Sequence, residues 1–188
     1  KCSNMTTTSV DTVADGRIGK YFTIRLVDEN GKALANKFIQ IGFNGKAYNR
    51  TTNATGHARL QINLKYQGTY TFAVSFLGDD DYNGSFVVAK ITVLKQTPKL
   101  STSSKTYSSS AKTKTLSATF TTAKGNPVSG MTVKFTVNGK TYTAKTNAKG
   151  VASVNVSLTV KKTYTFTVSF AGDNAYSAKS TSAKVVIK

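Results

Sequence analysis

The chain repeats itself at a spacing of 94 residues, and this repeat limits its fold more than any other feature. From Lys20 to Lys90 the two copies align without a gap, and residues 18–94 share 24 identities with residues 112–188 over 77 pairs. A unit of about 90 residues has the size of a small domain. The sequence therefore predicts two modules of one fold, residues 1–95 and 96–188.

The boundary between the copies falls near Pro98, a residue that interrupts the hydrogen-bond ladder between adjacent strands. The connector is too short to act as a free tether, so we expect the modules end to end with restricted hinge motion. The first 17 residues match copy two poorly at this spacing, and we expect an edge strand with altered pairing over residues 10–16. The Ser/Thr/Lys-rich stretch 101–115 is compatible with either a strand or a partly disordered linker.

Apolar residues alternate with polar ones in both copies, which indicates strands rather than helices. Phe72, Val74 and Phe76 share one face of a predicted strand, and residues 60–64 and 154–158 show the same alternation. Thr, a strand former, is abundant throughout the chain. No apolar run approaches the roughly 18 residues that a membrane-spanning helix requires, so we expect no membrane span.

Turn chemistry completes the prediction of the fold. Asn44-Gly45 and Asn138-Gly139 each separate two strand-like runs, and Asn-Gly favours the type I′ turn of a hairpin. About seven short strands in each copy predict an all-β chain of two tandem immunoglobulin-like β-sandwich domains. Tyr70 and Tyr164 open the penultimate strand of each copy, where a tyrosine corner is expected.

One string of residues carries a family resemblance and occurs twice. It reads Thr-Asn-Ala-x-Gly-x-Ala, then Leu, then Thr-Tyr-Thr-Phe-x-Val-Ser-Phe-x-Gly-Asp-x-x-Tyr, from Thr52 to Tyr82 and from Thr146 to Tyr176. This pattern resembles the tandem bacterial-type Ig-like repeats of large cell-surface adhesin-like proteins, such as those of methanogenic archaea. The resemblance implies an extracellular, cell-surface module that extends, presents or adheres, and it transfers no catalytic residue.

The composition argues against an enzyme. The chain has one Cys, one Glu and one His (His57), so a nucleophile–base–acid set and a Cys/His metal site are hard to assemble. His57 corresponds to Val151 in copy two, which indicates a packing or surface position. We therefore expect no catalytic residue and no cofactor.

Asp79, Asp80 and Asp81 form the chain's densest group of carboxylates and are candidate Ca²⁺ ligands. The alternative is that Asp79 caps a tight turn through its side chain. Copy two keeps Asp173 but follows it with Asn174 and Ala175, so a structural Asp accounts for both copies. We therefore expect Asp79 and Asp173 to be structural and no metal site.

The positive charge is unevenly distributed. The net charge of the chain is +18, of which residues 1–94 carry +4 and residues 95–188 carry +14. All basic residues of the second half are Lys, whereas the four Arg lie in the first half. Dispersed Lys favours solubility or weak attraction to polyanions, because specific phosphate recognition prefers the Arg fork. We expect no specific nucleic-acid partner.

Two functional hypotheses remain from the sequence. The first is a non-catalytic stalk that presents a distal binding region of a longer surface protein, with other repeats of the same chain as its partners. The alternative is a module that binds a glycan or an anionic wall polymer through its loops or the basic face of module 2. Its partners would be anionic cell-surface polymers or glycans on another cell. The alternative would be favoured by exposed aromatic side chains converging at one end, with Tyr107, Tyr142 and Tyr176 as candidates.

Overall fold

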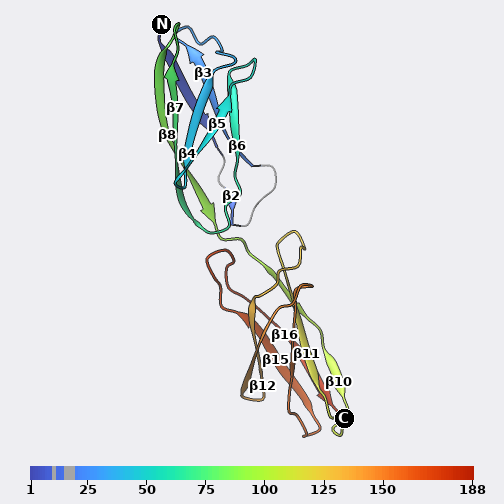
Figure 1. The fold of residues 1–188 in the computed structure, drawn as a ribbon. Coiled ribbons are helices and arrows are strands. Elements are labelled where there is room, and N and C mark those ends of the chain that lie inside the picture. Colours follow the sequence, from blue (N-terminus) through green and yellow to red (C-terminus); the bar gives the residue numbers. More distant parts are fainter. Residues whose placement is uncertain (10–11, 15–19) are drawn as a thin grey trace. The chain divides into compact units, whose positions relative to one another are not determined.

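The structure, a computed structural model, describes residues 1–9, 12–14 and 20–188. It divides into two compact units, Lys1–Lys95 and Gln96–Lys188, which we call module 1 and module 2 (Figure 1). The described residues form strands and turns, and among them no helix is long and apolar enough to cross a membrane. The predicted all-β fold class is confirmed.

Module 1 consists of a three-stranded and a five-stranded sheet. The first has the order β1 (Ser3–Thr8), β3 (Tyr21–Asp28), β6 (His57–Gln61). The second has the order β2 (Thr12–Val13), β8 (Asn83–Leu94), β7 (Gly68–Gly78), β4 (Phe38–Phe43), β5 (Lys46–Thr51). All pairs are antiparallel except β2 with β8, which run parallel.

Module 2 repeats this topology. Its three-stranded sheet has the order β9 (Lys99–Thr102), β11 (Thr115–Thr121), β14 (Val151–Asn155). Its five-stranded sheet has the order β10 (Lys105–Tyr107), β16 (Lys179–Ile187), β15 (Thr163–Phe170), β12 (Thr132–Val137), β13 (Lys140–Lys145). The stretch 101–115 therefore holds the end of β9, all of β10 and the first residue of β11, and turns and irregular backbone lie between them.

The core of each module lies between the inner faces of its two sheets, as the predicted alternation requires. Phe72, Val74 and Phe76 of β7 are buried, and so are Phe166 and Val168 of β15. The alternate residues of these strands are more exposed. Two sheets that each bury one face pack as a β-sandwich.

The alternation predicted over residues 60–64 extends beyond the strand itself. β6 ends at Gln61, although Ile62 and Leu64 still point into the core. The ladder with β3 closes where the Ile62 amide donates to the Lys20 carbonyl at 2.9 Å, and the Val156 amide does the same to Lys114 in module 2. Strand geometry therefore stops where its hydrogen-bond partner stops, whereas burial continues.

The N-terminal strands align at a spacing of 95 residues, not 94. Met5 lies opposite Leu26 in β3, and its counterpart Leu100 lies opposite Phe120 in β11. One additional residue therefore separates Ala14 from Lys20 in module 1, which explains the poor match of the first 17 residues at a spacing of 94. Of the predicted edge strand over 10–16, residues 12–13 form β2, whereas 10, 11, 15 and 16 lie outside the described residues.

Candidate functional site

The repeated Thr-Asn-x-x-Gly segment forms the same turn in both modules. The buried Thr52 hydroxyl donates to the Leu34 carbonyl at 2.6 Å and accepts from the Lys37 amide at 2.9 Å. Thr146 makes the equivalent bonds to the Val128 carbonyl and from the Met131 amide, at 2.7 and 2.9 Å. The side chain thus satisfies backbone groups that would otherwise be buried without partners.

The backbone conformation of this turn requires an Asn and a Gly at these two positions. Asn53 Oδ1 accepts from the backbone amides of Thr55 and His57, and Asn147 Oδ1 accepts from those of Lys149 and Val151. Gly56 and Gly150 have φ of 77° and 76°, and a Cβ at either would lie 2.5 Å from a backbone oxygen of the facing strand. Only Gly tolerates both the left-handed backbone and this close approach.

The Gly-Asp-x-x-Tyr segment forms a second matched turn. Asp79 Oδ1 accepts from the amides of Asp81 and Tyr82, at 2.9 and 2.8 Å. Asp173 Oδ1 accepts from those of Ala175 and Tyr176, at 2.8 and 2.7 Å. Both carboxylates therefore close a tight turn through their own side chains.

Asp79 has one partner that Asp173 lacks. The Lys37 ammonium donates to Asp79 Oδ2, and this bond, together with the Tyr82 amide, lowers the pKa of Asp79 below its ordinary value of 3.8. The same bond raises the pKa of Lys37. The residue at the equivalent position of module 2 is Met131.

Both oxygens of the Asp79 carboxylate therefore have hydrogen-bond partners within the protein. Asp80 and Asp81 are exposed neighbours in the turn. Among the residues that the structure describes, no group of three or more His, Cys, Asp or Glu side chains is arranged to hold a metal ion.

The predicted hairpin glycines and corner tyrosines have the geometry that their roles require. Gly45 and Gly139 have φ of 74° and 75°, and each follows an Asn at 51°, as in a type I′ turn. The Tyr70 hydroxyl donates to the Tyr66 carbonyl at 2.8 Å. The Tyr164 hydroxyl donates to the Val160 carbonyl at 3.0 Å. Each hydroxyl thus ties the penultimate strand to the loop that precedes it.

The three tyrosines named as candidates for a binding end do not converge. Tyr176 is buried, with its ring edge-on to Phe120 at 5.3 Å. Tyr107 and Tyr142 lie on β10 and β13, the two opposite edge strands of one sheet. These three candidates therefore give the binding alternative no support, because Tyr176 is a core residue.

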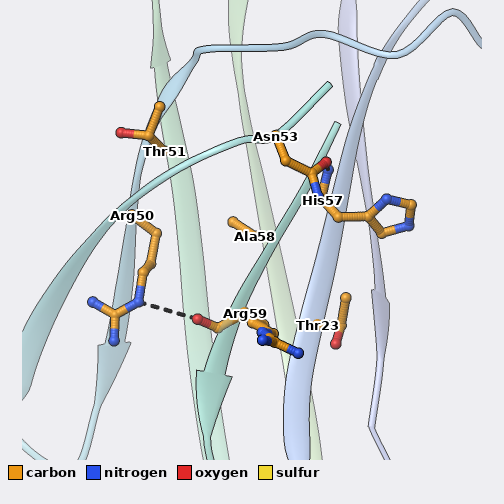
Figure 2. A pocket seen from close by; sticks show the side chains of 7 residues that line it. All are labelled: Thr23, Arg50, Thr51, Asn53, His57, Ala58 and Arg59. Carbon is orange, nitrogen blue, oxygen red and sulfur yellow. Dashed lines mark hydrogen bonds between the residues drawn. The ribbon is translucent and has the colours of Figure 1, made fainter. Parts of the chain in front are cut away.

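A groove on module 1 brings together residues that the sequence did not single out as a group. It is lined by Thr23, Arg50, Thr51, Asn53, His57, Ala58 and Arg59. Figure 2 shows Arg50 reaching from β5 to the carbonyl of Arg59 on β6, with the His57 ring and Thr23 on the other side of that strand. We call this set of residues the module 1 groove.

Three comparisons with known proteins place these features among known folds. The sequence model of the bacterial Ig-like domain (group 1) matches residues 99–185, within module 2. The fold is similar to that of invasin, a bacterial integrin-binding protein, with 18% identity, a TM-score of 0.64, and coverage of 98% of this chain and 40% of that one. It is also similar to a tetra-tandem repeat from the extending region of a large adhesion protein, with 20% identity, a TM-score of 0.52, and coverage of 100% of this chain and 49% of that one. The chain thus spans less than half the length of either structure, and at these identities the likeness establishes the immunoglobulin-like fold alone.

Proposed function

We propose that this chain is a non-catalytic, extracellular pair of repeats that serves as part of the stalk of a cell-surface adhesin-like protein. The resemblance of its turn motifs to adhesin-like repeats supports the surface location. A fold shared with the extending region of a large adhesion protein supports the spacing role.

The observation that carries the proposal is the path of the chain through each module. The Lys1 carbonyl accepts from the Asn83 amide at 2.8 Å, so the chain enters beside the start of β8, and it leaves after Leu94 at the end of that strand. In module 2 the Gln96 carbonyl accepts from the Ser177 amide at 3.0 Å, shortly before β16, and the chain leaves after Ile187. Entry and exit therefore lie at opposite ends of each module.

This path makes each repeat add length. A strand of 12 residues such as β8 spans roughly 40 Å at about 3.3 Å per residue. A module that returned its chain to the entry end would add bulk without reach. The partners of such a pair are neighbouring repeats of the same chain on either side.

The test places the 188-residue chain between an unrelated surface anchor and an unrelated binding domain, in one, two or three copies. A stalk predicts that capture of a target held behind a polymer brush increases with copy number. It also predicts that unrelated Ig-like modules of equal length work equally well. Capture that is independent of copy number but lost on this exchange would contradict the stalk role.

A further inference from the structure

Module 1 carries a group of cationic side chains that form no ion pair with any carboxylate among the described residues. Arg25 of β3 lies opposite His57 of β6, and Arg59 of β6 lies opposite Thr23, so these side chains share the outer face of the three-stranded sheet. Arg50 reaches the same strand from β5. Within the described part of the chain, no carboxylate forms an ion pair with Arg25, Arg50 or Arg59. The fourth arginine, Arg17, lies outside the described residues.

The three guanidinium groups are held in place by contacts that leave other donors available. Arg50 donates through Nε to the Arg59 carbonyl at 3.1 Å and through one terminal nitrogen to the Asn49 carbonyl at 2.8 Å. Arg25 donates through Nε to the Thr55 carbonyl at 3.3 Å. The Arg59 guanidinium lies 4.2 Å from the centre of the Tyr21 ring. A guanidinium has five N–H donors, so each group keeps free donors that are already oriented.

The fold does not need these charges. At the equivalent positions of module 2, Thr119, Ala144, Val151 and Ser153 replace Arg25, Arg50, His57 and Arg59. There the facing side chains bond to each other, Ser117 with Ser153 and Thr115 with Asn155, both at 2.9 Å. The same sheet therefore forms with uncharged residues at these four positions, so the arginines of module 1 call for another explanation.

We propose that the module 1 groove binds an acidic polysaccharide. The guanidinium groups of Arg50 and Arg59 would donate hydrogen bonds to the carboxylate or sulfate groups of its sugars. An oriented guanidinium with free N–H groups suits a planar or tetrahedral oxyanion better than an ammonium does. Thr23, Thr51 and Asn53 add uncharged polar side chains to the same lining, which suits the hydroxyl groups of a sugar ring. This proposal does not depend on the stalk role.

The groove fits an acidic sugar better than a nucleic acid. Single-stranded nucleic acid is bound largely by bases stacking on open aromatic rings. The Tyr21 ring beside the groove is instead covered by Arg59, and the Tyr48 ring faces Arg50 at 6.0 Å. Module 2, although it carries more charge, offers only Lys, which binds oxyanions as a mobile point charge.

The experiment measures binding of the whole chain to immobilised polygalacturonate, dextran sulfate and duplex DNA at physiological salt. We expect saturable binding to at least one of the two polysaccharides, and the polymer bound identifies carboxylate or sulfate as the preferred group. Arg50→Lys with Arg59→Lys keeps the net charge, and we expect it to weaken that binding about tenfold. Arg50→Ala with Arg59→Ser installs the residues of module 2 and should weaken it at least as much.

Two controls keep the proposal falsifiable. Lys134→Ser with Lys149→Ser removes two charges from module 2, and binding should then stay within about twofold, because neither lysine lines the groove and salt screens exposed charges that do not contact the ligand. Circular dichroism melting of each variant separates loss of binding from loss of folding. Binding to DNA as tight as binding to the polysaccharide would overturn the proposal, and so would no binding to either polysaccharide. It would also be overturned if the Lys134→Ser, Lys149→Ser variant lost as much binding as the arginine variants, or if the Arg50→Lys, Arg59→Lys variant bound as tightly as the parent chain.

Discussion

The two modules share their turns and differ on their surfaces. Equivalent residues of the two copies make the same hydrogen bonds or adopt the same left-handed turn conformation, and we call these residues the shared frame. They are Thr52, Asn53, Gly56, Tyr70 and Asp79 in module 1, and Thr146, Asn147, Gly150, Tyr164 and Asp173 in module 2. Outside that frame, Arg and His in module 1 are replaced by small or neutral residues in module 2. The comparison teaches that the repeated motif maintains the fold, whereas any binding role must be sought where the copies diverge.

The cores also differ, although their frames match. In module 1 the Phe72 ring stacks between Phe22 and Phe43, at 4.2 and 4.3 Å. In module 2 the aromatic contacts join Phe120 to Phe170 and Tyr176, at 4.8 and 5.3 Å. The aromatic clusters thus occupy different levels of the same sandwich, so one topology accepts different packing solutions.

The outer face of the five-stranded sheet is more apolar in module 1 than in module 2, which is also the module with the higher net charge. Phe38, Leu77, Phe86 and Val88 are more than half exposed in module 1. Their counterparts in module 2 are Thr132, Ala171, Ser180 and Ser182. Module 2 is therefore the more uniformly polar unit.

The largest effect is expected from removing a core aromatic in either module. Phe166→Ala should destabilise module 2 by roughly 3 to 5 kcal/mol, because a fully buried ring leaves a cavity. Phe72→Ala should cost module 1 at least as much, since it loses two stacked neighbours. Scanning calorimetry should show one transition displaced and the other unchanged in each variant. An unaltered thermogram would mean that these faces are not inward.

A smaller, matched effect is expected at the turn glycines. Gly56→Ala and Gly150→Ala should each cost roughly 1 to 3 kcal/mol of backbone strain, increased by the contact with a facing carbonyl. Gly31→Ala and Gly125→Ala share the positive φ but have open space around the Cβ, so they serve as controls. Chemical unfolding should give each Gly56→Ala or Gly150→Ala variant a lower free energy of unfolding than its control variant. Equal losses would show that the close approach of the facing carbonyl to the added Cβ is unimportant.

The tyrosine corners should contribute about equally. Tyr70→Phe and Tyr164→Phe each remove one hydroxyl that donates to a backbone carbonyl. The expected loss is about 1 kcal/mol per module, the usual net value of such a bond. Urea titrations of both variants measure it, and a loss in one module alone would show that the corner is not part of the shared frame.

The smallest expected effect is a difference between the two Asp turns in how the stability of their modules depends on pH. The bond from Lys37 lowers the folded pKa of Asp79, so its stabilising contribution is present above about pH 4 and disappears as pH falls through the lowered pKa. Lys37→Met installs the residue of module 2, and it should make the melting temperature of module 1 less sensitive to acid between about pH 2 and 5. Parallel melting curves for the variant and the parent chain would contradict this assignment.

The fold was largely predictable from the sequence because its signals are local. Asn44-Gly45 and Asn138-Gly139 specify their hairpins by backbone preference, and the alternation around Phe72 specifies an inward face. The end of β6 at Gln61 was not predictable, because it depends on where a distant strand stops pairing. The offset of 95 residues at the N-terminal strands was hidden for a similar reason, since strand pairing rather than residue identity defines it.

The candidate binding surface was less predictable than the frame. The sequence indicates a packing or surface position for His57, and the structure makes it half-buried on the groove. Its neighbours on the groove are separated in sequence and meet only through strand pairing. The available signal was the loss of Arg25, Arg50, His57 and Arg59 at the 94-residue spacing. Tyr176, a candidate for an exposed binding residue from the sequence, is instead buried. An aromatic residue in a turn motif can complete the core, and the sequence alone does not distinguish the two positions.

The most direct test of the central claim combines stability and binding in one variant. Arg25→Thr, Arg50→Ala, His57→Val and Arg59→Ser together install the module 2 residues at these four positions and leave the shared frame untouched. The account predicts that calorimetry still shows a cooperative transition for module 1 while binding to the acidic polysaccharide is lost. A module that unfolds, or one that stays folded and binds as before, would contradict the separation of frame from function.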